Sequence, residues 1–333
     1  MSVEIMMSES TEVSVKGKSA SVKSVQADGR TIVVTGRFLK TATVFDEEFV
    51  EGDVVSDPRT VISALKESGA RADIFTFPEK LNETTPRHPY CFEWDNAAVA
   101  NTTNFNEWWE KLPQETRKNV RKAAKKGVVV QSATFDGDFV RGIKELYDET
   151  PIRQGRRFWH FGKDLETIKR ENSTYLDRSE FIGAYYNGEL IGFMKFVRVG
   201  KIANMMQILS KSAHFDKRPM NALIAKAVEI CQAEGLSYLV YSKFTYGNKM
   251  QSQIAEFKRR NGFVQMNFPR YFIPLTIKGK LALRLNLHRG VLGVLPSWLV
   301  EWLWQLRAAI LAFGSKSRPD ASKGVRECEA EAR

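Results

Sequence analysis

Residues 246–266 read YGNKMQSQIAEFKRRNGFVQM and carry the pattern that decides the fold. Three apolar residues recur at i, i+4 and i+7 and predict a helix with one buried face: Met250, Ile254 and Phe257. Asn248 is placed to cap the first turn of this helix, with Gln251 as its capping-box partner. Asn261 and Gly262 then supply a left-handed stop, after which a strand begins.

Size and charge narrow the range of functions. The chain has 333 residues, enough for two modest domains or for one extended domain with appendages. Its hydrophobic content of 43% and charged content of 27% are ordinary for a globular protein, but its net charge of +11 is not. Such an excess of cations favours an anionic partner: nucleic acid, a phosphate-bearing substrate or an anionic membrane.

Cysteines, histidines and the first residues argue against several classes of protein. The three cysteines have no CxxC pairing, which argues against a disulfide framework and a structural zinc site. Four histidines without HxH or HxxxH spacing predict no metal site. The start, MSVEIMMSESTEV, lacks the basic and apolar regions of a secretory signal, so we expect a cytoplasmic protein.

Hydrophobic patterning divides the chain into segments. We expect strands at 31–39, 41–50, 72–77 and 88–94 and a helix at 57–69, which together make a small α/β unit. The predicted segments are a disordered tail (1–28), an N-terminal α/β half-domain (29–112), a basic connecting helix (113–127), an α+β domain (128–276), an apolar helical appendage (277–313) and a second disordered tail (314–333).

The connecting helix carries a stripe of positive charge. Pro113 fits its first turn and Gly127 fits its end. Six cations share one broad face, which we call the basic stripe: Arg117, Lys118, Arg121, Lys122, Lys125 and Lys126. The stripe is either a phosphate-binding surface for a substrate, with Arg117, Arg121 and Lys125 as candidates, or only the solvated face of an amphipathic helix.

Strands and helices alternate between residues 134 and 276. Asn187-Gly188, between FIGAYY and ELIGFMKFV, predicts a two-residue hairpin turn. A strand at 203–210, a helix at 219–235, a strand at 237–244 and the helix described above follow. The order is therefore hairpin, strand, helix, strand, helix, strand.

This order resembles the core of the GNAT acyltransferases, an α+β fold with a mixed sheet flanked by helices. The helix that ends in N-G-F before a closing strand also resembles the last helix of that fold. Two motifs resemble more narrowly the Fem aminoacyltransferases, which are tandem GNAT-like enzymes: the FK pair Phe257-Lys258, and TRKNVRKA at 116–123, similar to the helix before their second domain. The resemblance implies a degenerate N-terminal half, a fuller C-terminal GNAT-like domain, and acyl transfer onto an amine.

The resemblance also implies where an acyl donor would bind. GNAT folds polarise the acyl carbonyl with main-chain N–H groups where two central parallel strands part, here 203–213 and 237–244. Their glycine-rich pyrophosphate loop corresponds to 216–222, which contains no glycine, so the donor is either acyl-CoA or the aminoacyl-tRNA that Fem enzymes use. Three residues at the start of the 219–235 helix are candidates for holding donor phosphates: Lys217, Arg218 and Asn221.

Candidates for the chemistry come from the last helix and its surroundings. The resemblance implies that Lys258 stabilises the oxyanion or the leaving group and that Phe257 lines the channel. Alternatively, Lys258 only begins the solvated run 258–260. Tyr246 could donate a proton and His214 could act as a general base, although each also fits a structural role. Asp95 and Glu180 are further acidic candidates.

Two more segments bear on binding. ETPIRQGRRFWHFGKD (149–164) interleaves aromatic residues with Arg153, Arg156 and Arg157, as in loops that bind phosphates and flat rings; the alternative is a packing loop. Residues 280–313 are strongly apolar but are interrupted by Arg, Pro and Glu, so we predict no transmembrane span. They form either a helix packed on protein or an interfacial helix in peripheral contact with a membrane.

These patterns together predict an N-acyltransferase that moves an acyl or aminoacyl group onto an amine of a small-molecule or lipid-linked acceptor in the cell envelope. Acyl-CoA or aminoacyl-tRNA would be the donor, and tRNA would be a partner in the second case. The alternative, which the missing glycine loop favours, is a catalytically silent GNAT-like module that binds RNA or an anionic membrane.

Overall fold

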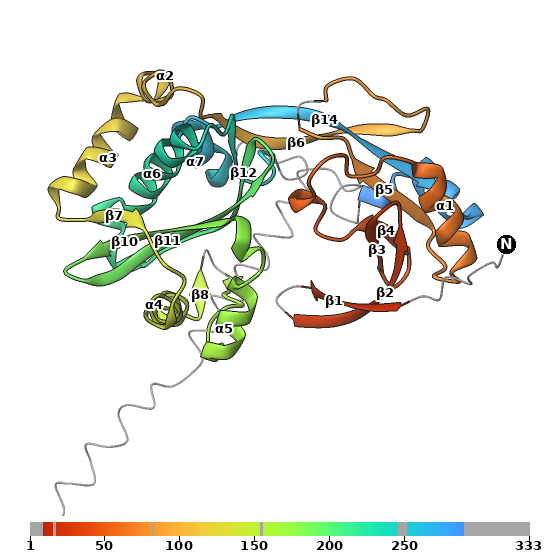
Figure 1. Cartoon of the computed structure of the whole chain (residues 1–333), viewed down its shortest axis with the longest axis horizontal. Helices are drawn as coiled ribbons and strands as arrows, with labels where there is room; N and C mark the ends of the chain where they lie inside the picture. Colours follow the sequence, from red (N-terminus) through yellow and green to blue (C-terminus); the bar gives the residue numbers. More distant parts are fainter. Residues whose placement is uncertain (1–8, 16–17, 82, 154–155, 246–251, 290–333) are drawn as a thin grey trace, which may run out of the picture. The chain divides into compact units, whose positions relative to one another are not determined.

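The computed structural model describes residues 9–15, 18–81, 83–153, 156–245 and 252–289. Up to His288 the chain forms one compact unit. A mixed sheet runs through this unit in the strand order β1-β2-β3-β4-β5-β14-β6-β13-β12-β11-β10-β7 (Figure 1). The mixed sheet with its flanking helices confirms the predicted α+β class.

The N-terminal part of the sheet begins earlier than the sequence predicted. Its elements are β1 (Glu9–Val15), β2 (Lys18–Ala27), β3 (Arg30–Thr35), β4 (Thr41–Val44), the 3-10 helix η1 (Glu47–Phe49), α1 (Pro58–Glu67) and β5 (Ile74–Pro78). The prediction of a disordered tail at 1–28 is wrong for β1 and β2. Val25 and Ala27 are buried in a core shared with α1, and the mixture of small, apolar and polar residues is that of a half-buried strand.

The C-terminal part follows the predicted order of elements. They are α2 (Phe105–Lys111), α3 (Gln114–Lys125), β7 (Val129–Ser132), α4 (Gly137–Asp148), β8 (Ile152–Arg153), β9 (Arg156–Arg157), α5 (Leu165–Asn172), η2 (Leu176–Arg178), β10 (Ser179–Tyr186), β11 (Glu189–Val199), β12 (Ile202–Ser210), η3 (Ser212–Lys217), α6 (Pro219–Ala233), β13 (Tyr238–Val240), α7 (Gln253–Arg260) and β14 (Val264–Pro274). The hairpin turn is confirmed, since Asn187 and Gly188 have φ of 50° and 82°, both left-handed as a type I′ turn requires. The basic connecting helix is α3.

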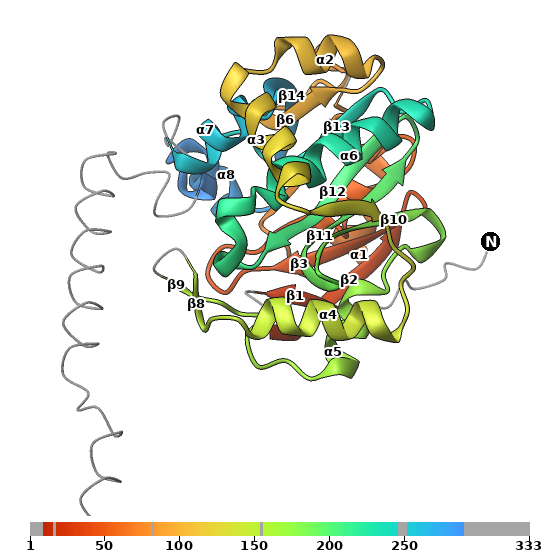
Figure 2. The same cartoon turned by 90° about the vertical axis from the view of Figure 1, so that its left-hand side faces the viewer.

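Helices cover both faces of this part of the sheet (Figure 2). α6 packs on one face, with Leu223, Ala227 and Cys231 fully buried against β10–β12 and α3. α4 packs on the other face, where Ile143 and Tyr147 meet β11 and α5.

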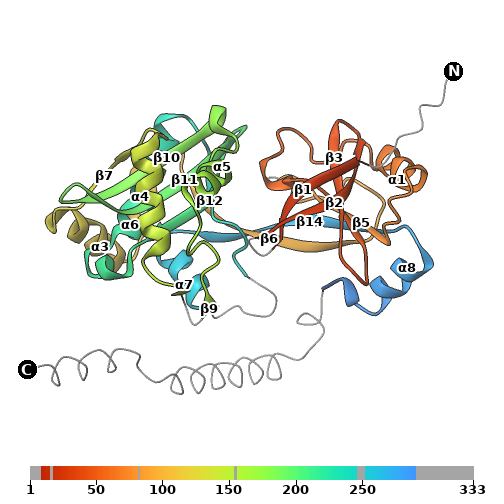
Figure 3. The ribbon, with the colours of Figure 1, turned by 90° about the horizontal axis from the view of Figure 1, so that it is seen from below.

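Two long strands are exchanged between the halves (Figure 3). β6 (Phe92–Asn101) belongs by sequence to the N-terminal half, yet it pairs with β13. β14 ends the C-terminal half, yet it pairs with β5. The two strands also pair with each other over eight residues, from Val264↔Val99 to Tyr271↔Phe92. Each half thus completes the other's sheet, and in each half two parallel strands pair over only three residues: β4 with β5, and β12 with β13.

Helix α7 begins later than the sequence predicted. Ser252 is its cap, because the side chain accepts the N–H of Ala255 at 3.1 Å. The predicted cap Asn248 and its partner Gln251 lie outside the described residues. The predicted stop is confirmed, with Gly262 at φ 80°.

A last helix, α8 (Ile277–Arg284), follows β14 and leads into η4 (Leu287–Arg289). It lies so close to the N-terminal half that a Cβ on Gly279 would come within 1.9 Å of the Asp73 carbonyl oxygen. The predictions for 290–333 fall outside the described residues. Within the part that the structure describes, no helix has both the length and the apolarity to cross a membrane.

We expect Gly279→Ala to lower the free energy of unfolding by about 1–3 kcal/mol, because helix or backbone must shift to admit the methyl group. Urea unfolding measures this change. Lys280→Ala, on the exposed side of the same helix, is the matched control and should leave stability nearly unchanged. Equal stability of both variants and the parent would contradict the close packing of α8.

Candidate functional site

The two central parallel strands part after three residue pairs. β12 and β13 pair at Ile202↔Tyr238, Ala203↔Leu239 and Asn204↔Val240. β12 then continues to Ser210, with no further described strand paired to it on that side. The chain leaving β13 instead follows β6: the Tyr241 N–H donates to Ala98, and the Ala98 N–H donates to Ser242, both at 2.8 Å. We call the opening between 205–210 and 241–243 the strand fork. The predicted parting of these strands is confirmed.

The backbone on both sides of the fork is irregular. In β12, Met205 pairs with Phe196 and Gln207 pairs with Lys195, so Met206 is the extra residue of a β-bulge. On the other side, Ser242 has φ 48°, an unusual left-handed conformation for a serine. The main chain therefore leaves the regular ladder on both sides of the opening.

Lys258 is fully buried beside the fork. Its Nζ donates to the carbonyl oxygens of Tyr241 at 2.7 Å and Lys243 at 2.6 Å, and it lies 4.3 Å from the centre of the Tyr241 ring. Burial lowers the pKa of Lys258 to about 8. The alternative that Lys258 merely begins a solvated run is wrong, because the exposed cations of α7 are Arg259 and Arg260.

Phe257 and Asn221 support the same helix. Phe257 is partly buried against the core between the sheet and α6, and its carbonyl accepts the Asn261 side-chain amide at 2.8 Å. Asn261 in turn accepts the side-chain amide of Asn221 at 2.8 Å. Asn221, predicted to hold donor phosphate, thus ties α6 to the end of α7.

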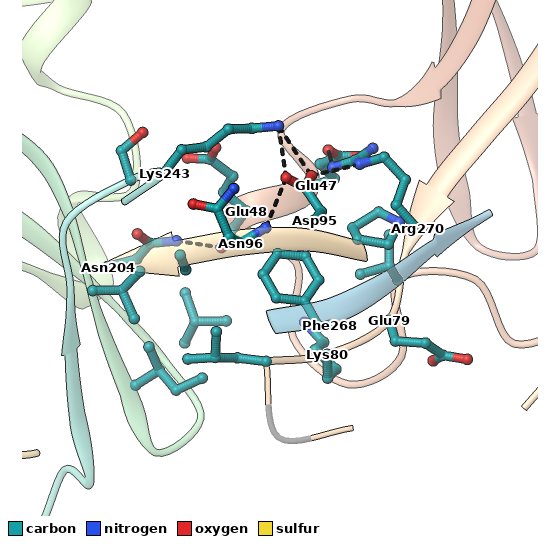
Figure 4. Close-up of a pocket in the computed structure, with 18 residues that line it drawn as sticks. Glu47, Glu48, Glu79, Lys80, Asp95, Asn96, Asn204, Lys243, Phe268 and Arg270 are labelled. Atoms are coloured by element: carbon teal, nitrogen blue, oxygen red, sulfur yellow. Dashed lines mark hydrogen bonds and ion pairs between the residues drawn. The ribbon is translucent and has the colours of Figure 1, made fainter. Parts of the chain in front are cut away.

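A cavity of about 110 Å³ lies between the two halves, on the face of the sheet opposite to α6 (Figure 4). We call it the seam cavity. Ala203 and Leu239 point into the core beneath α6, whereas the alternate residues Asn204 and Val240 line the cavity. Its other polar lining residues include Glu47, Glu48, Asp95, Lys243 and Arg270. Lys243 is also the residue whose carbonyl binds Lys258, so segment 241–243 separates the buried lysine from the cavity.

A charged network forms one wall of the seam cavity. Arg270 lies half-buried between two carboxylates: its Nε donates to Asp95 at 2.7 Å, and its guanidinium also binds Glu47. Lys243 holds both oxygens of Asp95, at 2.8 and 3.0 Å. Burial by itself would raise the pKa of Asp95, but the charges of Arg270 and Lys243 hold this pKa below its usual range. Asp95 is therefore a charged anchor of the network and unsuited to accept a proton.

Glu48 behaves in the opposite way. Glu48 is exposed as a residue, but the protein packed around its carboxyl at the cavity raises the pKa of this carboxyl, and the negative charge of Glu47 adds to the effect. Its main-chain carbonyl accepts the Asn204 amide at 2.8 Å, next to the start of the fork. Glu48 was not among the residues predicted from the sequence. The signal that could have found it is the acidic run Asp46–Glu48 directly after a strand.

The candidates for phosphate binding gather around the start of α6. Arg218 is exposed and caps the helix with φ 60°, and Lys217 lies 4.6 Å from the centre of the Tyr186 ring. Lys126 pairs with Asp216 at 2.6 Å and so joins the end of the basic stripe to the same place.

The basic stripe itself is partly engaged. Arg117 pairs with Glu110 at 2.5 Å, whereas Arg121 is exposed, 5.4 Å from the centre of the Trp109 ring. Lys125 is exposed. Arg121 and Lys125 therefore remain available to an anion.

Among the described side chains, the predicted arginines of the 149–164 loop and the predicted base His214 do not line the seam cavity. Arg153 donates to the carbonyls of Ser210 and Leu146, and it pairs with Glu149 at 2.8 Å, which fits the packing-loop alternative. Arg157 is exposed on β9 beside Arg156. His214 contacts Glu189 and the Tyr186 ring at the end of the β10–β11 hairpin.

Glu180 pairs with Arg198 at 2.8 Å. Tyr246 lies outside the described residues. Among the described residues, no three His, Cys, Asp or Glu side chains gather where they could hold a metal ion.

Comparison with known proteins places this geometry in a known fold. No protein-family model matches the chain, and no curated protein matches its sequence. Solved structures do match. The C-terminal domain (DUF2156) of a putative lysylphosphatidylglycerol synthetase from Agrobacterium fabrum has a TM-score of 0.53 at 14% identity, over 79% of this chain and 87% of that one. FemX has a TM-score of 0.51 at 11% identity, over 84% and 90% of the two chains. L-PGS from Bacillus licheniformis has a TM-score of 0.53 at 12% identity, over 82% of this chain and 89% of that one.

The chain shares the fold of these proteins. The predicted GNAT-like architecture of the Fem type is thereby confirmed as a fold. With identities this low, the likeness does not carry an activity across, and the function must be argued from the fork and the seam cavity.

Proposed function

We propose that the chain is an N-acyltransferase that moves an aminoacyl or acyl group from an activated ester onto an amine acceptor at the strand fork. The observation that carries the proposal is the fork itself, where two parallel strands part at a bulge and a bend, with the buried ammonium of Lys258 on the bent segment. Main-chain N–H groups and a fixed positive charge are what a developing oxyanion needs.

The reaction balances with the residues at hand. An amine in the seam cavity attacks the acyl carbon, a C–N bond forms, and the carbonyl oxygen becomes an oxyanion stabilised at the fork. An acceptor that arrives as an ammonium ion first gives one proton to water, so that the neutral amine can attack. As the C–N bond forms, the nitrogen gives a second proton to Glu48, whose raised pKa suits a general base. The C–O or C–S bond to the donor then breaks, and the leaving oxygen or sulfur takes this proton from Glu48. Acidic side chains on the cavity wall would attract an acceptor that arrives as a cation, whether a small molecule or a lipid-linked amine.

For the donor we favour aminoacyl-tRNA over acyl-CoA. The loop before α6 has no glycine with which to cradle a pyrophosphate, and Arg121, Lys125 and Arg218 offer exposed cations beyond what a small donor needs. A thermal-shift screen with aminoacyl-tRNA, acetyl-CoA and longer acyl-CoAs tests this choice, since a ligand that binds only the native state raises the melting temperature. Stabilisation by an acyl-CoA alone would reverse the choice of donor.

Glu48→Gln is expected to lower turnover by about 10²–10³-fold, because the amide cannot accept the proton of the amine. A general base must be deprotonated to act, so the rate rises with pH through the pKa of Glu48. Because that pKa is raised, the rising limb should lie above the usual range of a glutamate, and it should vanish in the variant. The pH profile of kcat/KM measures both effects.

Glu51→Gln is the matched control, because this exposed side chain lies in the same loop and does not line the cavity. It should retain the rate and the profile. If Glu48→Gln keeps full activity and the rising limb of its pH profile is unchanged, Glu48 is not the general base. That result would leave the proposed role of the fork unaffected.

A further inference from the structure

Five large apolar side chains are exposed together on and beside α8. Ile277, Leu281 and Leu285 recur at i, i+4 and i+8 and share one face of the helix, with exposures of 90%, 55% and 52%. Leu287 follows at 50%, and Phe38, in the β3–β4 loop, is 87% exposed. Lys278 joins the two segments, since its Nζ donates to the Phe38 carbonyl and lies 5.2 Å from the ring centre. We call these five residues the α8 patch.

The opposite side of α8 fixes the patch in place. Thr276 caps the helix by accepting the Gly279 N–H at 3.0 Å, and its hydroxyl donates to Asp73 at 2.9 Å. Gly279 and Ala282 are buried against the N-terminal half. The inward face therefore holds the helix against the N-terminal half, and the larger apolar residues on the outward face make no contribution to the core. A contiguous apolar surface of this kind usually marks a docking site.

The carboxylates next to the patch are paired, since Asp73 binds Thr276 and Lys278 and Glu93 lies 2.7 Å from His288. No acidic residue occurs between Glu256 and Glu301, and three exposed cations stand near the patch: Arg37, Lys280 and Arg284. Apolar residues at the centre with lysine and arginine at the margin are the pattern of a helix that lies in the headgroup region of an anionic bilayer.

We propose that the α8 patch docks the protein on an anionic lipid bilayer, with Phe38 and Ile277 entering the boundary between headgroups and acyl chains. The structure of the patch supports this independently of the transfer reaction. Docking would hold the N-terminal half at the surface where lipid-linked molecules lie.

An environment-sensitive label tests the proposal in the full chain. Ile277→Cys carrying an NBD group is prepared with Cys91 and Cys328 changed to serine; Cys231 is buried and does not react. Vesicles that contain phosphatidylglycerol should shift the NBD emission to the blue and raise it several-fold, whereas phosphatidylcholine vesicles should not. The same label at Val129, which is 57% exposed on β7, is the matched control and should not respond.

Binding to the vesicles gives a second measure. Phe38→Ser with Ile277→Ser should lower the fraction that sediments with anionic vesicles by about tenfold or more, whereas Val129→Ser should not. Three results would overturn the proposal. The NBD emission at position 277 could stay unchanged when anionic vesicles are added, or the double variant could sediment with the vesicles as well as the parent does. The third is a blue shift of the emission that depends on protein concentration and occurs without lipid. The last would show that a second copy of the chain covers the patch.

Discussion

Replacing Lys258 by methionine is expected to lower turnover by about 10²–10³-fold, because the fork loses the positive charge that stabilises the oxyanion. Methionine fills a similar volume, so the main structural cost is two carbonyls, of Tyr241 and Lys243, left without their donor. That cost is about 1–3 kcal/mol in the free energy of unfolding. Stability must therefore be measured beside the rate.

The chain contains a matched control for this variant. Lys195 is also fully buried, donates to two main-chain carbonyls (Asn172 at 2.8 Å and Thr174 at 2.6 Å), and has its pKa lowered to about 8 by burial. It lies on β11, where its backbone pairs with Gln207 beside the bulge, but its side chain points away to the carbonyls of Asn172 and Thr174. Lys195→Met should cost similar stability and leave turnover per folded molecule unchanged. Equal loss of turnover in both variants would make Lys258 a purely structural residue.

The pH profile separates the two lysines further. Lys258 carries its charge below its pKa of about 8 and loses it as the pH rises through that value. If the charged form is the active one, the rate should fall above pH 8, far below the 10.5 of an ordinary lysine. This falling limb should persist in Lys195→Met and disappear in Lys258→Met.

Arg270→Met is expected to lower the free energy of unfolding by about 1–3 kcal/mol, because the half-buried Glu47 loses its cation and the buried Asp95 keeps only Lys243. Arg270 joins β14 to η1 through Glu47 and to β6 through Asp95, and so links the two halves at the seam cavity. Adding Asp95→Asn to the variant should recover part of the loss, because the buried carboxylate that has lost Arg270 is then removed.

Arg198→Met is the comparison for Arg270→Met. Arg198 also bridges two carboxylates, Glu180 and Glu234, but it is more exposed, so water can replace the lost partner. Its loss should cost about 0–1 kcal/mol. Urea unfolding of the three variants measures these differences. A loss for Arg270→Met no larger than that for Arg198→Met would contradict the buried network.

Local signals made the order of elements predictable. Asn187-Gly188, the periodicity of α6 and the N-G-F stop each act within a few residues, and each led to the right element. The exchange of β6 and β14 was not predictable, because it depends on pairs such as Val264↔Val99 that no local pattern encodes. The segment 9–27 was misjudged for a related reason: strands in which small and polar residues outnumber the valines resemble a tail until their partners are known.

The candidate site, like the fold, was predictable only where the signal lies within a few neighbouring residues. Lys258 was found because it belongs to a short motif, whereas Glu48 and the seam cavity were missed because their residues run from 47 to 270 in the chain. Arg153 matched a binding pattern, yet it serves packing, because three nearby acceptors already hold its guanidinium. Residue type and spacing identified the lysine, but only the folded arrangement identified the cavity beside it.

Selective NMR of the methionine amides tests the strand fork most directly. The chain has nine methionines, and the signals of Met205 and Met206 are assigned by substitution to leucine. Protein labelled with ¹⁵N-methionine is titrated with stable mimics of the donors, an acyl-CoA thioether and an amide-linked aminoacyl-adenosine. We predict that one mimic shifts the amide resonance of Met206 strongly while that of Met194, buried in the core, stays in place. A mimic that binds by calorimetry yet leaves Met205 and Met206 unmoved would contradict acyl transfer at the fork.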